Sequence, residues 1–407
     1  MTTTINNEHK KLNVPNLRFP EFQGEWKEER LADIAKFYKG TGISKDQLSD
    51  EGEPCILYGE LYTKYKSETI GKVISKTNID NTKLVKSKTN DVIIPCSGET
   101  AEDIATARCV LNDNILLGGD LNIIRLHGYD GTFMSYQLNG KRKYDIARVA
   151  QGVSVVHLYG EHLKGVKTIN PCLEEQKKTA NLLSLLDERI ATQNKIIEDL
   201  KKLKSAISKH LFSRKDLLET TIRLADIATL KNGYAFQSRK YDTQGKWKIL
   251  TIANVSGERY INDDDCNCII NLPNDIQDHQ VLKEGDILIS LTGNVGRVSL
   301  CKAGNNLLNQ RVGLLCITKN VNQEFLYQVL SSRKFENSMV ACGQGAAQMN
   351  IGKGDVENFV LPYSSNTNNI HLVARILHSY DECIINEQQE QTLLTMQKQY
   401  FLDQMFI

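Results

Sequence analysis

The stretch from Glu174 to Phe212 constrains the fold of this chain more than any other, because nothing in it interrupts a helix. It contains neither proline nor glycine. Apolar side chains return along it every three or four residues, which predicts one helix with a single apolar stripe close to a heptad repeat. At a rise of about 1.5 Å per residue, this helix would be about 57 Å long. A helix of that length needs a partner along its apolar stripe.

The partner is expected at the C-terminal end, where residues Asn369 to Phe406 repeat the spacing. The two stretches align at a fixed offset, since Asp187–Ile190 matches Asp381–Ile384 and 381 − 187 = 194. We therefore predict that the two helices pair as an antiparallel coiled coil. The expected seam consists of Leu186, Ile190, Ile197, Leu200, Ile207 and Leu211 on the first helix, and Leu377, Tyr380, Ile384, Leu394, Phe401 and Met405 on the second.

Polar residues interrupt this seam at equivalent places in the two helices. Gln193 aligns with Glu387, and Lys204 aligns with Lys398. Polar groups in a seam weaken it but specify its register and the number of partners. The alternative, two unrelated surface helices, is disfavoured because the repeat extends well beyond the helices.

The whole chain is a duplication. The hexapeptide Arg30–Ala35 recurs unchanged as Arg223–Ala228, and 223 − 30 = 193. Gln151–Gly152 recurs as Gln344–Gly345 at the same offset. This period is too long for a solenoid repeat and indicates a duplicated domain followed by a helix.

The duplication defines the domain organisation and an α+β fold class. We predict two similar mixed α/β globular domains, separated by two long helices that pair as an antiparallel coiled coil, with an internal pseudo-twofold axis. The expected parts are an N-terminal lead (1–19), a first globular domain (20–170), a first spacer helix (171–213), a second globular domain (214–366) and a second spacer helix (367–407).

Within the globular domains, short apolar runs bounded by turn residues predict buried strands, and longer amphipathic runs predict helices. The central segments 56–80 and 249–273 share little sequence, which indicates one frame serving two related but different ligands. The expected strands are 91–96, 121–127, 285–291 and 311–318, and the expected helices are 133–147 and 325–339.

Composition places the chain among ordinary globular proteins, with 41% apolar and 24% charged residues. No apolar run approaches the roughly 20 residues that cross a bilayer, and the N-terminus has no apolar signal core, so we expect a cytoplasmic protein without a membrane segment. The ten cysteines are scattered without a C-x-x-C motif, which favours reduced thiols over disulfides or structural zinc. A net charge of +1 neither supports nor excludes a nucleic-acid partner.

The sequence does not indicate catalysis. It contains no P-loop, nucleophile elbow or H-E-x-x-H motif. Residues 170–172 begin like the N-P-P-aromatic signature of amino methyltransferases but lack the second proline and the aromatic residue, so we interpret them as a helix start. Asp263–Asp265 could hold a divalent metal, although such runs are more often solvated turns. Cys96 and His157 could form a nucleophile and base, but nothing in their spacing supports it. We expect no catalytic residue, no metal and no cofactor in this chain.

The loops carry a different pattern, in which aromatic, basic, hydroxyl and amide side chains alternate. Such groups suit phosphate contacts and the reading of base edges, although each taken alone is also ordinary loop chemistry. The candidate DNA-binding residues are Lys39, Thr41, Lys45, Tyr58, Tyr62, Thr63, Lys64, Ser97, Thr100, Gln151 and Ser154 in the first copy, and Lys231, Tyr234, Ser238, Arg239, Asn254, Thr292, Asn294, Arg297, Gln344 and Gln348 in the second.

Four stretches carry a resemblance to a known family. They are Trp26–Ile34, its second copy Arg223–Ala228, the loop Thr292–Gly296, and the Gln344–Gly345 loop that leads through Leu361 and Pro362 to the last helix. With them, the chain from about residue 14 to its end resembles the specificity subunit of type I restriction–modification systems. The first copy departs from the pattern at 97–101, where Glu99 replaces an asparagine and the second glycine is missing.

The resemblance implies that each globular domain is a target-recognition domain that reads one half of a split site in double-stranded DNA. It implies that the paired helices are a spacer and a platform for two adenine-N6 methyltransferase subunits, which carry S-adenosylmethionine. Cleavage and translocation would belong to separate restriction subunits of the full complex. Since half-sites one turn apart are separated by about 34–36 Å, the helix length would set the gap between them. The alternative is a tandem-domain coiled-coil scaffold that does not bind DNA.

Overall fold

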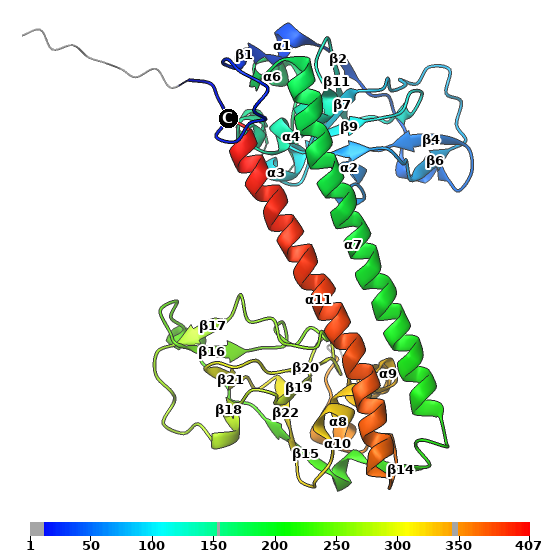
Figure 1. The fold of residues 1–407 in the computed structure, drawn as a ribbon, viewed down its shortest axis with the longest axis vertical. Coiled ribbons are helices and arrows are strands. Elements are labelled where there is room, and N and C mark those ends of the chain that lie inside the picture. Colours follow the sequence, from blue (N-terminus) through cyan, green and yellow to red (C-terminus); the bar gives the residue numbers. More distant parts are fainter. Residues whose placement is uncertain (1–11, 153–154, 344–348) are drawn as a thin grey trace, which may run out of the picture. The chain divides into compact units, whose positions relative to one another are not determined.

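The protein is described by a computed structural model that covers residues 12–152, 155–343 and 349–407. The chain divides into two compact units. Unit 1 combines the residues up to Asn194 with Glu390–Ile407, and unit 2 is Lys195–Gln389. Both boundaries fall inside the two long helices α7 (Leu173–Ser213) and α11 (Thr367–Met405), so each unit contains part of each helix (Figure 1).

The two long helices run antiparallel within each unit. In unit 1, Leu183 near the start of α7 belongs to one apolar cluster with Met405 at the end of α11. In unit 2, Leu211 near the end of α7 belongs to a cluster with Val373 and Leu377 near the start of α11. Acidic residues in the first turn of α7 and His210 in its last turn also suit the helix dipole.

The residues expected in the seam are all at least partly shielded. The buried ones are Leu211, Leu377, Ile384, Leu394 and Met405, and the half-buried ones are Leu186, Ile190, Ile197, Leu200, Ile207, Tyr380 and Phe401. The heptad spacing missed Leu183, which is fully buried, because it faces the globular domain residues Phe133 and Tyr136 as well as α11.

Unit 1 contains two main sheets. In the larger sheet all neighbours are antiparallel except the β5–β9 pair. Its strands, in spatial order, are β2 (Ala35–Lys39), β11 (Leu121–Leu126), β7 (Asp91–Pro95), β9 (Arg108–Val110) and β5 (Thr69–Ile70). The smaller sheet contains β10 (Leu116–Leu117), β4 (Glu53–Ile56), β6 (Ser75–Thr77) and β3 (Leu48–Ser49).

Short ladders and helices complete unit 1. Strand β1 pairs with β13 and thereby joins the start of the domain to the segment before α7. The remaining elements are β1 (Lys27–Arg30), α1 (Leu31–Ile34), α2 (Glu60–Thr63), β8 (Ser97–Gly98), α3 (Ala101–Ile104), α4 (Gly131–Asn139), α5 (Lys143–Val149), β12 (Val156–His157), α6 (Gly160–Lys164), β13 (Lys167–Asn170) and the short 3₁₀ turn η1 (Lys45–Gln47).

Unit 2 repeats this plan. The central strands of its sheets have the same order, including the parallel pair of β16 with β21 that corresponds to β4 with β10, whereas the edge strands β5, β3 and β18 belong to one unit only. One sheet contains β15 (Ala228–Asn232), β22 (Val312–Ile317), β19 (Ile287–Ser290) and β20 (Val298–Leu300). The other contains β17 (Asn267–Ile269), β16 (Trp247–Leu250), β21 (Asn306–Leu308) and β18 (Val281–Leu282).

The other elements of unit 2 correspond in the same way, since β14 pairs with β23 as β1 pairs with β13. They are β14 (Thr220–Arg223), β23 (Val360–Tyr363), α8 (Gln323–Leu330), α9 (Arg333–Cys342), α10 (Lys353–Glu357), and the 3₁₀ turns η2 (Leu224–Asp226), η3 (Ser238–Lys240) and η4 (Asp278–Gln280). The repeated hexapeptide has the same role in both copies, because its Leu and Ile side chains are buried at 31 and 34 and at 224 and 227.

The four strands expected from apolar runs are confirmed as β7, β11, β19 and β22. The two expected helices were each wrong in continuity. Residues 133–147 are divided between α4 and α5, because α4 ends at Asn139 with Gly140 as its C-cap. Residues 325–339 are divided between α8 and α9, because the Ser332 side chain accepts a hydrogen bond from the amide of Phe335 and starts a new helix.

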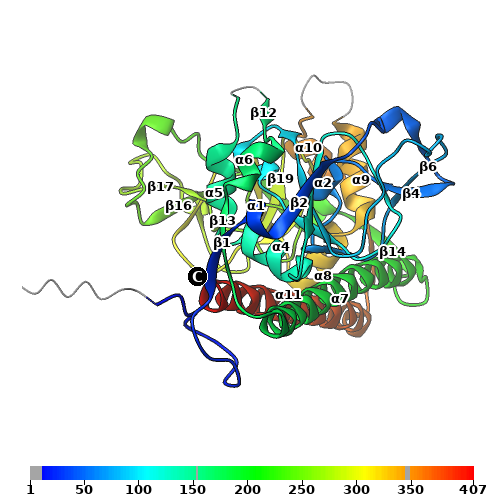
Figure 2. The same ribbon diagram turned by 90° about the horizontal axis from the view of Figure 1, so that it is seen from above.

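The segment that precedes the first domain lies against the end of α11 within unit 1 (Figure 2). The amide of Leu17 donates a hydrogen bond to the carbonyl oxygen of Gln404 at 3.0 Å. Arg18 forms an ion pair with the buried Glu175 at 2.7 Å. Trp26 packs edge-to-face against Phe133 in the same apolar cluster, so residues 17–26 help to hold the start of α7 and the end of α11.

Candidate nucleic-acid interface

In the first copy, three candidates from distant parts of the chain meet at one edge of the domain. Ser97 pairs with His157 in the β8–β12 ladder, and His157 forms a bridge with Gln151. The Ser97 hydroxyl donates to Asp120 at 3.2 Å, and the Lys39 amine lies 3.9 Å from the same carboxylate. This edge therefore presents the exposed Lys39 and Gln151, while Ser97 is buried and supports them.

The second copy builds the corresponding edge around the turn between β21 and β22. The amide of Tyr234 donates to the carbonyl of Leu308, and the amide of Gln310 donates to the carbonyl of Tyr234. On the other side, the amide of Leu291 donates to the carbonyl of Arg311. The loop that begins at Thr292 is therefore held next to this turn, and Thr292 itself bridges to Asn350.

Arg311 is a candidate that the sequence reasoning missed. Arg311 is exposed and occupies the position of Asp120 in the first copy, with 311 − 120 = 191. The equivalence rests on one backbone hydrogen bond, because the amide of Cys96 donates to the carbonyl of Asp120 and the amide of Leu291 donates to the carbonyl of Arg311. The sequence feature that could have identified Arg311 is the polar run Asn309–Arg311, which lies directly before the strand β22. At one position the two copies thus carry opposite charges.

The remaining candidates differ in how freely they can reach a ligand. Tyr58, Thr41, Tyr62, Tyr234 and Arg297 are half-buried, and Thr292 is buried. The Lys64 amine forms an ion pair with the Glu60 carboxylate at 2.6 Å. Ser154, Gln344 and Gln348 lie outside the described residues. The exposed candidates are Lys39, Lys45, Thr63, Thr100 and Gln151 in the first copy, and Lys231, Ser238, Arg239 and Asn294 in the second.

Asn254 requires a correction, because its side chain is occupied inside the domain. It is only 5% exposed. Its Oδ1 accepts hydrogen bonds from the amide and hydroxyl of Thr251 at 2.7 and 2.9 Å, and its Nδ2 donates to the carbonyl of Asn262 at 2.8 Å. Glu60 has the same role in the first copy, where it accepts the amide of Leu57 at 3.0 Å. Both residues brace the turn after the equivalent strands β4 and β16, and an amide so engaged is unavailable for base reading.

Tyr62 and Tyr234 remain neutral phenols. The hydrogen bond that Tyr234 donates to Asp275 at 2.8 Å raises the pKa of the tyrosine. Burial raises the pKa of Tyr62. Both side chains therefore retain a hydroxyl donor and an aromatic face at neutral pH.

Cys96 and Asp263, which the sequence analysis considered as a nucleophile and as a metal ligand, have local structural roles. Burial raises the pKa of Cys96 to about 11, so the thiol stays protonated and is a poor nucleophile. Asp263 pairs with Lys248 at 2.6 Å and with Lys302 at 3.0 Å. Over the described ranges, no three His, Cys, Asp or Glu side chains are grouped as they would be to hold a metal ion. No helix in the same ranges is long and apolar enough to cross a membrane.

The long helix α11 also exposes an apolar stripe in unit 1. Leu393, Met396 and Tyr400 are 63%, 64% and 56% exposed. Their spacing of three and four residues places them on one face of the helix, away from the buried Leu394. Contiguous exposed apolar side chains of this kind mark surfaces that bind other proteins.

Both copies match one protein family, the type I restriction modification DNA specificity domain, over residues 23–202 and 219–396. The chain belongs to this family. The two matches confirm the duplication and the resemblance inferred from the sequence, and each includes one globular domain with most of the helix that follows it.

Curated relatives agree over most of their length. The chain is 26% identical over 372 residues to the type I restriction enzyme MjaVIII specificity subunit of Methanocaldococcus jannaschii, which covers 85% of this chain and 83% of the relative. It is 22% identical over 393 residues to the putative type I restriction enzyme MjaX specificity subunit of the same organism, covering 87% and 86%.

Solved structures share the fold. The S subunit of a type I restriction–modification system from M. genitalium matches with a TM-score of 0.61 at 18% identity, covering 97% of this chain and 99% of that one. A chain from a structure on complex assembly and conformational transition of the type I restriction–modification system matches with a TM-score of 0.54 at 15% identity, covering 93% and 96%. The predicted arrangement of two mixed α/β domains with paired long helices is confirmed.

Proposed function

We propose that this chain reads a bipartite site in double-stranded DNA, with each globular domain contacting one half. The observation that carries the proposal is the duplicated DNA specificity domain. The two copies share their central strands, but the residues exposed at the candidate edge differ between them. Asp120 in one copy is replaced by Arg311 in the other, and the central segments share little sequence. A common frame with different contact groups suits two half-sites of different sequence.

The paired helices act as the spacer between the half-sites and as the platform for two adenine-N6 methyltransferase subunits. The exposed stripe Leu393, Met396 and Tyr400 supports this role, because it offers an apolar face on the helix pair for one such subunit. The restriction and translocase subunits bind in the full complex. We assign the complex to the cytoplasm, where its DNA is found.

The chain itself is non-catalytic in this proposal. Support comes from the protonated thiol of Cys96 and from the lysines that occupy Asp263. S-adenosylmethionine would be bound by the methyltransferase subunits, which would also rotate the target adenine out of the duplex.

The test is a genome-wide map of N6-methyladenine in cells with the chain and its methyltransferase, and in cells that lack only the chain. We expect a split motif, two short half-sites around a fixed unspecified gap, that disappears with the chain. Exchange of residues 30–165 for those of a relative should then change one half only. An unchanged map together with failure to co-purify a methyltransferase would favour the scaffold alternative. Salt-sensitive binding to duplex DNA separates the two functions independently.

A further inference from the structure

Glu68 and Arg259 occupy the same place in the two copies. The amide of Cys109 in β9 donates to the carbonyl of Glu68 at 2.8 Å, and the amide of Leu300 in β20 donates to the carbonyl of Arg259 at 2.7 Å. The offsets agree, since 259 − 68 = 191 and 300 − 109 = 191. Both residues lie in the divergent central segments 56–80 and 249–273, which carry the least shared sequence of the two domains.

The long helices present an equivalent buried ion pair to each of these residues. In unit 1, Lys398 of α11 pairs with Asp187 of α7 at 2.6 Å. In unit 2, Lys204 of α7 pairs with Asp381 of α11 at 2.5 Å. The two lysines and the two aspartates are each 194 positions apart, and all four side chains are at most 17% exposed. The helix frame therefore carries the same Lys–Asp pair in both units.

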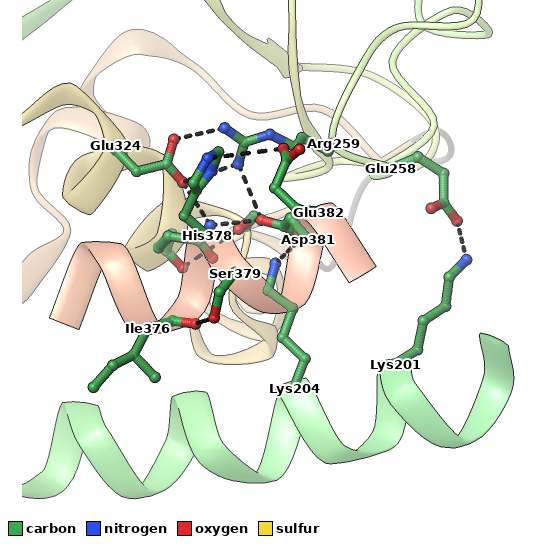
Figure 3. Close-up of polar contacts among 12 residues, drawn as sticks. Lys201, Lys204, Glu258, Arg259, Glu324, Ile376, His378, Ser379, Asp381 and Glu382 are labelled. Atoms are coloured by element: carbon green, nitrogen blue, oxygen red, sulfur yellow. Dashed lines mark hydrogen bonds and ion pairs between the residues drawn. The ribbon is translucent and has the colours of Figure 1, made fainter. Parts of the chain in front are cut away.

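The two central segments contact this pair with opposite charges. In unit 1, Glu68 binds the lysine, with its carboxylate 2.8 Å from Lys398. In unit 2, Arg259 binds the aspartate, with its guanidinium 3.0 Å from Asp381 and 2.6 Å from Glu324 (Figure 3). The close-up shows Arg259 lying between these two carboxylates, while Lys204 reaches Asp381 from α7.

Each cluster nevertheless contains two acids and two bases. In unit 1, Glu68 and Asp187 both pair with Lys398. The second base is Arg108, which donates its hydrogen bonds to the carbonyls of Ala107 and Tyr65, and burial lowers the pKa of Arg108 and raises that of Glu68. In unit 2, Asp381 and Glu324 are balanced by Lys204 and Arg259. His378 lies 3.6 Å from Glu324 and 3.8 Å from Glu382. Neutrality matters because an unpaired buried charge is strongly destabilising.

We propose that Glu68 and Arg259 are positioning residues that fix the divergent segment of each domain against the helix pair and so set its orientation toward its half-site. This inference rests on the proposed function. It also predicts which central segments can replace one another. The residue at the position of Glu68 or Arg259 can carry either charge, provided that the ion-pair cluster as a whole remains neutral.

The test for the second copy uses R259M and R259K in the full chain assembled with its methyltransferase. R214M is the matched control, because Arg214 pairs with Asp216 on the surface. Methylation rates are measured on duplexes with the mapped site and with single-base changes in either half. R259M should lower discrimination in the half read by domain 2 by about tenfold, which is the cost of about one mismatched base pair. Discrimination in the other half should stay within about twofold, and R259K should restore most of the loss.

The first copy supplies the mirror experiment. E68Q should relax the half read by domain 1 only, with E161Q as its control, because Glu161 pairs with Lys164 at the surface. Should R259M not fold, E324T takes its place. Position 324 corresponds to Thr132, because each lies two residues after the N-cap of its helix. These N-caps are Asn322, which accepts a hydrogen bond from the amide of Phe325, and Asp130, which accepts one from the amide of Phe133. E324T removes one of the two carboxylates that hold Arg259 and should relax the same half.

The outcomes separate the two proposals. Loss in both halves alike, no loss in either half, or an R259K variant as impaired as R259M would overturn the positioning role while the split motif of the wild-type complex stands. A wild-type complex that methylates no split motif would remove the proposed function and the positioning role together.

Discussion

Tyr136 and Gln328 donate hydrogen bonds to equivalent helix aspartates, Tyr136 to Asp187 at 2.6 Å and Gln328 to Asp381 at 2.6 Å. A phenol and an amide thus serve one function at one place in the two copies. The frame tolerates different residue types provided that a donor reaches the aspartate, which otherwise would be a buried acceptor without a full set of partners.

Removal of the lysine from the unit 1 cluster should be costly. K398M leaves Glu68 and Asp187 buried without their common partner, and we expect a loss of stability of about 3–5 kcal/mol. The double variant E68Q/K398M removes one of the two carboxylate charges and should recover part of that loss. Denaturant unfolding of the three variants checks this, and strictly additive effects of E68Q and K398M would contradict it.

Asp263 should make unit 2 sensitive to acid. The hydrogen bond from Lys248, together with Lys302, lowers the pKa of Asp263 to about 2, against the opposing effect of partial burial. Since the folded pKa lies below the ordinary value, the ionised carboxylate stabilises the fold above about pH 4, and this contribution is lost as the pH falls toward 2. D263N should therefore lower the melting temperature at pH 7, by the equivalent of about 1 kcal/mol.

The difference in melting temperature between the wild type and D263N should become smaller as the pH is lowered from about 5 to about 3. The exposed neighbour Asp265 provides the control, since D265N should have little effect at any of these values. A gap that stays constant over this range would mean that Asp263 acts through something other than its charge.

The apolar stripe on α11 should be needed for binding of the methyltransferase. L393E or M396E places a charge in an interface core and should weaken co-purification of that subunit at least about tenfold. T395E adds the same charge on another face of the helix and should leave co-purification intact. Equal retention of the partner by all three variants would place the docking surface elsewhere.

Arg311 should contribute to DNA affinity through its charge. R311A in the full complex should weaken binding and reduce the salt dependence of the affinity by about one counterion, because one phosphate contact is lost. Binding measured at several salt concentrations gives the slope directly. R214A is the control, and a slope for R311A that equals the wild-type slope would assign Arg311 to base reading or to no contact.

Part of the candidate interface followed from residue types alone, and part did not. Lys39 and Arg239 lie on the surface as expected for cations in polar loops. Asn254 did not follow, because an amide in a loop serves equally well as a turn brace, and only its bonds to Thr251 and Asn262 identify that role. Arg311 was missed because its exposure depends on how the β21–β22 turn packs beside Leu291.

The sequence alone determined the duplication, the two long helices and the buried strands, because these depend on local periodicity and on repeated residues at a fixed offset. It also marked Lys204 and Lys398 as polar interruptions at equivalent seam positions. Only the tertiary structure decided what those lysines bind. Glu68 and Lys398 are 330 positions apart, and their pairing at 2.8 Å depends on how a domain segment packs against a helix from the other end of the chain. An ion pair of this kind is a property of packing between distant segments, and no pattern within either segment encodes it.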